Sequence, residues 1–254
     1  MRLILNLMPT GSERYTVNHN YKIMSFIYRM LETTEFEYLH DTRKLFRGDK
    51  KRIPFCFSNV FSRYGFSDTK HKKHLIISSP DRNLILNIHA FLQKSINQNL
   101  KFGNLIFNLL DAKVFDCSTR SYKILTITPI IIRIPKSIYQ NYQLDIRHFY
   151  DYVYWREQFP LELFLNQLQR NLKKKYMDYY GKEPKNDLRF TNFILRKQIS
   201  QKLEIHGSTQ TLISTLWEFW FEESEIKDNM LFRFAIDAGL GERNSLGFGF
   251  VNPI

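Results

Sequence analysis

The sequence predicts an α+β fold made of two tandem ferredoxin-like domains, each with the RRM-like element order βαββαβ. The first observation is that both halves, residues 1–117 and 118–254, show this order of alternating and helix-spaced apolar stretches. The second is the composition, with 43% hydrophobic and 15% aromatic residues, which is enough for a buried core. The halves share no close sequence repeat, so the repeat lies in the order of the elements.

The first half begins with a strand at residues 2–8 that stops before Pro9. A helix follows, because Ile23, Ile27 and Met30 recur at helical spacing. A second helix is expected to start at Ser79, with Ser79 as the N-cap and a proline as the first helical residue. The other strands of this half are expected at residues 54–61, 74–79 and 104–116.

The second half opens with an apolar strand over residues 122–134. Leu161, Leu165 and Leu168 then form a helical stripe, and Gly181 is placed to end that helix. A last helix carries apolar residues at helical spacing up to Ala238. The remaining strands are expected at residues 189–197, 211–221 and 245–251.

The net charge of the chain indicates which class of partner it binds. The formal net charge is +12 and the sequence pI is about 9.6, which favours polyanionic partners, either nucleic acid or an anionic membrane surface. The longest apolar run, residues 124–134, is too short to span a bilayer, and the N-terminus lacks the apolar core of a signal peptide. Cys56 and Cys117 form no disulfide framework and are interpreted as buried thiols of a cytoplasmic protein.

Residues 237–251, DAGLGERNSLGFGFV, hold four of the ten glycines. A nucleotide-binding loop lies before the N-terminus of a helix, whereas here a helix ends at Gly239 and a strand is expected to follow. A helix C-terminus exposes carbonyl groups and repels anions, so nucleotide binding is rejected. In a strand, Gly247 and Gly249 would leave one face bare, where an adjacent element or a nucleic-acid strand can approach closely.

The segment GLGERNSLGFGFV resembles the C-terminal glycine-rich motif of the RAMP superfamily, and within it the CRISPR-associated endoribonuclease that cuts precursor CRISPR RNA. Further matches are MRLILNLMP, NHNYKIMSFIY, YLHD, a short strand at residues 55–58 and TITPIIIR. The resemblance implies two ferredoxin-like domains and metal-independent cleavage without a cofactor. In that reaction the ribose 2′-OH attacks the phosphate and leaves a 2′,3′-cyclic phosphate and a 5′-OH.

The resemblance also implies catalytic residues. His40 is the first choice, with Tyr28 beside it and a cation from Lys51, although Lys50 and Arg52 remain alternatives for that cation. A histidine suits acid or base catalysis near neutral pH. The competing interpretations are a solvated loop histidine for His40 and a tyrosine at the rim of the core for Tyr28. His19 is the reserve candidate, although a position that caps or flanks the helix explains it better.

RNA binding is expected from basic side chains and from the glycine-rich segment. Arg196 and Lys197 are neighbours on a predicted strand, so they should face opposite sides and only one should face RNA. The histidines of HKKH, residues 71–74, match no common zinc motif, and no metal site is expected. The candidates are Arg43, Lys44, Arg47, Lys50, Arg52, Arg196, Lys197, Gly241, Arg243, Asn244, Ser245, Gly247 and Gly249.

Two alternatives stay open beside the endoribonuclease. The chain could be a non-catalytic RAMP-type subunit that holds guide RNA in a CRISPR effector complex, or a general RNA-binding protein. The expected partners are CRISPR repeat RNA and precursor CRISPR RNA, with other effector-complex proteins and a homodimer left open, and no membrane.

Overall fold

The chain folds into two compact units in a computed structural model. Unit 1 consists of Met1–Ser118, Asp237–Gly239 and Asn244–Gly247, and unit 2 of Thr119–Ile236, Leu240–Arg243 and Phe248–Ile254. The two short segments Asp237–Gly239 and Asn244–Gly247 are therefore distant in sequence from Met1–Ser118, although they belong to the same compact unit. At His40, Ile205 and Glu225 only the main chain is described. The described residues are 1–16, 18–40, 53–64, 70–117, 121–144, 146, 150–205, 208–227 and 229–254.

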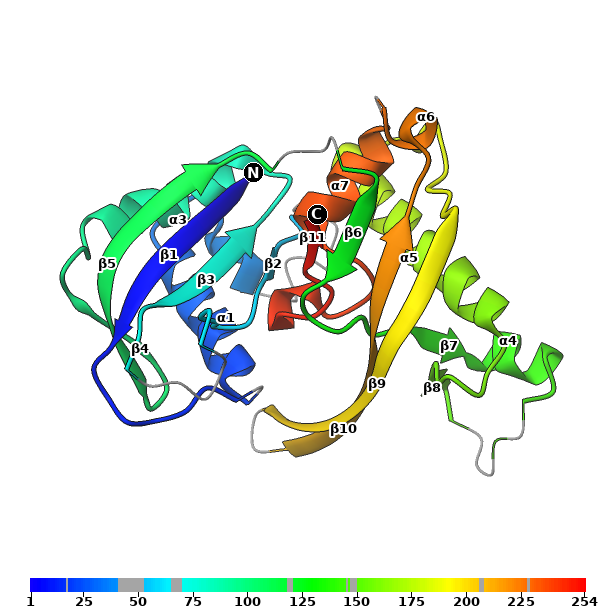
Figure 1. Cartoon of the computed structure of the whole chain (residues 1–254), viewed down its shortest axis with the longest axis horizontal. Coiled ribbons are helices and arrows are strands. Elements are labelled where there is room, and N and C mark those ends of the chain that lie inside the picture. Colours follow the sequence, from blue (N-terminus) through cyan, green and yellow to red (C-terminus); the bar gives the residue numbers. More distant parts are fainter. Residues whose placement is uncertain are drawn as a thin grey trace. The chain divides into compact units, whose positions relative to one another are not determined.

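Unit 1 is an antiparallel sheet with two helices on one side (Figure 1). Its strand order is β2-β3-β1-β5-β4, with β1 in the centre. Alternate residues Leu3, Leu5 and Leu7 of β1 are fully buried, as expected for a strand with one face on the core. The elements are β1 (Arg2–Pro9), α1 (His19–Leu31), the 3₁₀ helix η1 (Glu37–His40), β2 (Cys56–Phe57), β3 (Lys73–Ser78), α3 (Arg82–Gln93), β4 (Asn99–Phe102) and β5 (Leu105–Phe115).

The order βαββαβ expected for this half is confirmed, with β4 as an added strand. β4 pairs with β5 at the edge of the sheet. The strand expected at residues 54–61 is interrupted, because β2 pairs with β3 at Cys56 and Phe57 and pairing resumes only in an isolated bridge between Phe61 and His74. Asp81, not Ser79, is the N-cap of α3, and its side chain accepts a 3.1 Å hydrogen bond from the Leu84 N–H.

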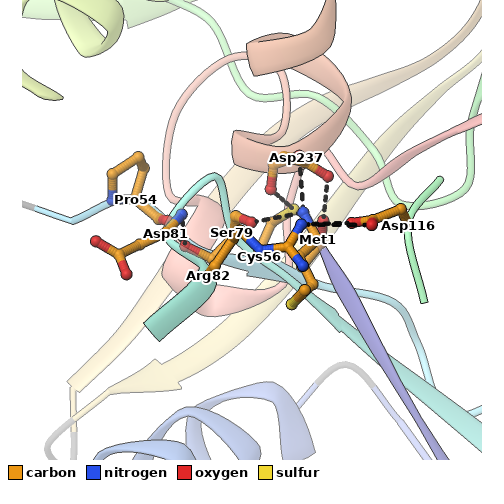
Figure 2. A network of polar contacts seen from close by, with 9 residues as sticks. Met1, Pro54, Cys56, Ser79, Asp81, Arg82, Asp116 and Asp237 are labelled. Carbon is orange, nitrogen blue, oxygen red and sulfur yellow. Dashed lines mark hydrogen bonds and ion pairs between the residues drawn. The ribbon is translucent and has the colours of Figure 1, made fainter. Parts of the chain in front are cut away.

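A buried polar network ties the end of α7 (Met230–Ala238) to the sheet of unit 1 (Figure 2). The Met1 amino group lies 2.8 Å from Asp237 Oδ2 and donates a 3.0 Å hydrogen bond to the Ser79 carbonyl oxygen. The Cys56 thiol donates to the Asp237 carbonyl oxygen at 3.6 Å. The cation and the carboxylate are thus paired where water is largely excluded, and these contacts explain why residues 237–239 belong to unit 1.

Unit 2 has an antiparallel sheet of order β11-β6-β10-β9 and a separate two-stranded ribbon, β7-β8. The helix α5 ends at Gly181 in the left-handed conformation, as the sequence predicted. Trp217 of β10 stacks on Phe164 of α5, with ring centroids 4.5 Å apart. The elements are β6 (Lys123–Thr126), β7 (Arg133–Pro135), α4 (Lys136–Asn141), β8 (Tyr152–Tyr154), α5 (Leu161–Tyr180), β9 (Asn192–Ile205), β10 (Ser208–Trp220), α6 (Glu223–Ile226), most of α7 and β11 (Val251–Pro253).

Two strand predictions in this half are corrected. The apolar stretch 122–134 is not one strand, because β6 and β7 belong to different sheets. The strand expected at 245–251 is wrong, since Asn244–Leu246 forms the 3₁₀ helix η2 and β11 begins only at Val251. The α+β class of two ferredoxin-like domains is confirmed by the antiparallel sheets and by the fold of related structures given below.

Candidate nucleic-acid interface and active site

The glycine-rich segment is a series of tight turns. Gly239, Gly241, Gly247 and Gly249 all have φ between 68° and 80°, a region that L side chains rarely adopt. The bare strand face inferred from the sequence therefore does not exist. Phe248 and Phe250 are each only 1% exposed, so the segment buries its aromatic side chains in the protein.

Within unit 1, Gly247 is required by close packing. A Cβ at this position would lie 2.5 Å from Cε2 of Phe57 and 2.9 Å from Nδ2 of Asn20. The same Asn20 amide donates a 2.9 Å hydrogen bond to the Leu246 carbonyl oxygen. The close approach expected at Gly247 is real, and its described neighbours are side chains of β2 and α1.

Within unit 2, Gly241 and Glu242 attach the segment to β7. A Cβ at Gly241 would lie 2.6 Å from the Ile131 carbonyl oxygen. The Glu242 N–H donates to that same oxygen at 2.9 Å, and the Glu242 carboxylate accepts from both the main-chain N–H and the guanidinium of Arg133. From α5, Lys175 donates a 3.1 Å hydrogen bond to the Gly241 carbonyl oxygen.

Arg243 is the half-exposed cation of this segment. Its φ of 57° is unusual for a residue other than glycine or asparagine. The guanidinium donates a 3.0 Å hydrogen bond to Gln210 Oε1. The preceding Glu242 holds Arg133 over the ring of Tyr152, which meets the Tyr154 ring edge-on. The two tyrosines were missed by sequence reasoning, although their alternation in YDYVYW is a signal for one exposed strand face.

The other predicted residues of the segment are less exposed. Asn244 is 8% exposed, and Gly249 is buried, with its N–H donating to the Pro129 carbonyl oxygen at 2.9 Å. Ser245, in η2, is half-buried. The buried glycines therefore allow the tight turns to form. The Arg243 side chain remains accessible to a ligand.

The catalytic candidates lie in unit 1. Tyr28 is half-buried on α1, and its ring meets the Phe55 ring edge-on with centroids 5.7 Å apart. His40 is the last residue of η1, and only its main chain is described. His19 is buried at the start of α1, with its Nδ1 accepting from the Thr16 N–H at 3.0 Å and its Nε2 3.0 Å from Asn104 Oδ1. These bonds fit the position flanking the helix that the sequence offered for His19.

The basic stretch after η1 lies outside the described residues. It contains one proposed catalytic residue and five proposed RNA-binding residues, on which the structure makes no statement. They are Lys51, and Arg43, Lys44, Arg47, Lys50 and Arg52.

Arg196 and Lys197 of β9 are both exposed. The pairing of β9 with β10 shifts here, since Leu195 faces Trp217 and Lys197 faces Leu216, which leaves Arg196 as an extra residue. A bulge interrupts the alternation of side chains, so the argument that the two must face opposite sides fails. Arg196 forms an ion pair with Glu218 of the adjacent strand.

Of the two histidines of HKKH, His74 lies in β3 and His71 precedes that strand. His71 stacks on Tyr64, with centroids 3.9 Å apart, and His74 Nδ1 is 2.9 Å from Asn6 Oδ1. Among the described residues, no group of three or more His, Cys, Asp or Glu side chains is arranged to hold a metal ion. Cys56 is buried, whereas Cys117 is only half-buried, which corrects the expectation that both thiols are buried.

The fold of this chain is shared by solved structures of RAMP-type and CRISPR-associated proteins. A solved structure described as "An RAMP protein binding different RNA substrates" has a TM-score of 0.69 at 21% identity, and covers 100% of this chain and 99% of its own. One described as "CRISPR associated protein Cas6" has a TM-score of 0.68 at 24% identity over 100% and 99% of the two chains. Both solved structures share the fold of this chain.

The family follows from the sequence. Residues 111–253 match the family model described as "CRISPR associated protein Cas6, C-terminal". The "CRISPR-associated endoribonuclease Cas6 2" of Methanocaldococcus jannaschii is 30% identical over 263 residues, with 100% of both chains covered. The chain belongs to the Cas6 family. Every helix within the described ranges falls short of the length and apolar character that crossing a membrane requires.

Proposed function

We propose that the protein is a metal-independent endoribonuclease that binds CRISPR repeat RNA and cuts precursor CRISPR RNA. The observation that carries the proposal is the similarity, over the whole length of both chains, to a relative named a CRISPR-associated endoribonuclease. The net charge of +12 supports a polyanionic substrate. The protein then acts in the cytoplasm, where its RNA is made, and needs no cofactor.

The proposed reaction is attack of the ribose 2′-OH on the adjacent phosphate, which leaves a 2′,3′-cyclic phosphate and a 5′-OH. It requires a base for the 2′-OH, an acid for the leaving 5′-oxygen and a cation for the charge on the phosphate. We assign the acid or base role to His40, with Tyr28 beside it and Lys51 as the cation. The half-buried position of Tyr28 on α1 is compatible with this role.

The proposed division of labour follows the two domains, 1–117 for catalysis and 118–254 for the glycine-rich motif. The glycine-rich motif contributes segments to both compact units, and Gly241, in unit 2, fixes the turn that presents Arg243 to the RNA phosphates. This assignment is supported by the hydrogen bonds that hold Arg243 and its neighbours to the ribbon and to β10.

The test is incubation of the protein with repeat RNA in EDTA, followed by analysis of the product ends. Wild-type protein should cut once per repeat, and treatment that opens cyclic phosphates should change the mobility of the 5′ fragment. His40→Ala should lose at least about 100-fold in cleavage rate and keep its RNA affinity. His89→Ala on α3 is the control, because His89 lies 3.2 Å from the Ala112 carbonyl oxygen and has no proposed role in catalysis.

Two results would contradict the proposal. Cleavage by His40→Ala at the wild-type rate would remove the catalytic assignment of His40. Tight binding of repeat RNA by the wild-type protein without any cleavage would instead indicate a guide-RNA-binding subunit of an effector complex.

A further inference from the structure

The two-stranded ribbon β7-β8 has one face occupied by an arginine and two tyrosines. Arg133 pairs with Tyr154, and Pro135 pairs with Tyr152. Because side chains alternate along a strand, these residues share a face, and the intervening Ile134 lies on the other face, where it is fully buried. The ribbon therefore has an apolar side within unit 2 and an aromatic, cationic side directed outward.

The tyrosines and Arg133 form an ordered stack. The Arg133 guanidinium carbon lies 4.7 Å from the centroid of the Tyr152 ring, within the range of a cation–π contact. The Tyr154 ring meets Tyr152 edge-on, with centroids 5.6 Å apart and planes at 77°. Glu242 fixes the Arg133 guanidinium from the side of the glycine-rich segment. Tyr152 is nevertheless 36% exposed, so its ring combines a fixed position with access from solvent.

The electrostatics of the stack favour an anionic ligand. The Tyr154 hydroxyl hydrogen-bonds Tyr152 and, together with Arg133 and Arg243, lowers the pKa of Tyr152 against the effect of burial. Burial and the same hydrogen bond raise the pKa of Tyr154 to about 12. The Glu242 carboxylate pairs with Arg133, whereas the Arg243 guanidinium is hydrogen-bonded to the neutral Gln210, so the cluster keeps a net positive charge beside an exposed aromatic ring.

Arg243 joins this stack to the glycine-rich segment. It follows Glu242 directly, and its left-handed φ of 57° costs energy that an unconstrained arginine would avoid. The hydrogen bond to Gln210 fixes its guanidinium, and the preceding Glu242 holds the Arg133 guanidinium over the Tyr152 ring. A cation that can bind a phosphate therefore lies next to a ring on which a base can stack.

We propose that the ribbon face formed by Arg133, Tyr152 and Tyr154 binds an unpaired base of the RNA strand whose phosphate contacts Arg243. The base stacks on Tyr152, because aromatic rings and guanidinium planes are the surfaces on which proteins hold unstacked RNA bases. Stacking tolerates every base, so this site fixes the path of a single strand and leaves sequence recognition to other contacts. The inference rests on the proposed function for the identity of the RNA.

The test compares the affinities of full-length variants for labelled single-stranded repeat RNA, measured by fluorescence anisotropy at one salt concentration. Tyr152→Ala should bind about tenfold more weakly, because stacking on an aromatic ring is lost. Tyr152→Phe keeps the ring and should stay within about twofold of wild type. The control is Tyr142→Ala, which removes a tyrosine of similar exposure, 41%, from the end of α4.

A series of repeat RNAs, each with one abasic nucleotide, identifies the stacked base. One abasic position should weaken wild-type binding about tenfold and leave Tyr152→Ala unaffected, because the ring and the base act as one pair. Equal affinities of Tyr152→Ala and Tyr142→Ala would overturn the inference, as would equal sensitivity of wild type and Tyr152→Ala to every abasic position. These are binding measurements, so they distinguish failure of the stacking site from failure of the proposed cleavage.

Discussion

The side-chain amide of Asn20, at the start of α1, donates a 2.9 Å hydrogen bond to the carbonyl oxygen of Leu246, at the end of η2. Asn20 is only 2% exposed, and its Oδ1 accepts a hydrogen bond from the Tyr15 hydroxyl. Burial raises the pKa of Tyr15, so this hydroxyl keeps its proton and remains a donor across the physiological range. This hydrogen bond joins residues that are far apart in sequence. It helps to hold Asn244–Gly247, the third chain segment of unit 1, against α1.

Replacing Asn20 should therefore destabilise the protein. In Asn20→Ala the Leu246 carbonyl oxygen loses this donor and the Tyr15 hydroxyl keeps only its bond to Asn59, so we expect the free energy of unfolding to fall by about 2 kcal/mol. Denaturant unfolding followed by circular dichroism measures this. Asn18→Ala is the matched control, because Asn18 is exposed and makes no side-chain cap hydrogen bond to α1. Equal stability of the two variants would show that the Asn20 bond contributes nothing.

A series of Gly→Ala substitutions separates backbone strain from close packing. Gly11→Ala has neither and should change stability by less than about 0.5 kcal/mol. Gly181→Ala has a left-handed φ of 69° but open space, and should cost about 1 kcal/mol. Gly247→Ala has both the left-handed φ and the overlap with Phe57, and should cost about 3 kcal/mol.

A larger substitution tests what Gly247 does for function. We expect Gly247→Val to impair folding or RNA binding and to leave the cleavage chemistry intact, because the proposed catalytic residues lie elsewhere in the sequence. Single-turnover cleavage at saturating protein, compared with RNA affinity, separates the two effects. A Gly247→Val variant with wild-type stability and affinity would contradict the packing argument.

Glu218 should make stability depend on pH in the acid range. Its hydrogen bond with Lys123, reinforced by Arg196, lowers the pKa of this carboxyl below the usual 4.5 despite its burial. A lowered folded-state pKa stabilises the protein above the unfolded value, and this contribution is lost as the pH falls below 4.5 through the folded-state pKa.

Glu218→Gln should consequently be less stable than wild type at neutral pH and show a flatter loss of stability below pH 4.5. Melting temperatures between pH 3 and 7 check this, with the exposed Glu204→Gln on β9 as control. Parallel curves for wild type and Glu218→Gln would show that the ion pairs do not shift this carboxyl.

Lys197 and Arg196 should differ in their contribution to RNA binding. Arg196 is ion-paired with Glu218, whereas Lys197 has no salt bridge within the part of the chain that the structure describes. If Lys197 neutralises one phosphate, Lys197→Ala should reduce the slope of log Kd against log salt by about 1. Arg196→Ala should change the slope less, because its charge is already shared with Glu218. The reverse order of the two slopes would contradict this ranking.

The order of elements could be predicted because it depends on local patterns. Helical spacing of Ile23, Ile27 and Met30 placed α1, and Gly181 was identified as the end of α5 from its position after an apolar stripe. The net charge and the glycine-rich motif pointed to an RNA-processing family, and the match of residues 111–253 confirmed that family. Each of these signals depends on residues that are close together in the chain, so it can be recognised in one sequence without knowledge of the fold.

Only the tertiary structure decided the form of the glycine-rich segment. The alternation of Gly247, Phe248 and Gly249 imitates a strand, but a strand requires hydrogen-bonding partners that the local sequence does not specify. The turns instead bring Gly247 against Phe57 and Asn20, which leave no room for a side chain at this position. Likewise the glycine-rich segment reaches the ribbon only through the bridge of Glu242 with Ile131 and its ion pair with Arg133 of β7, and distant contacts of this kind arise from folding.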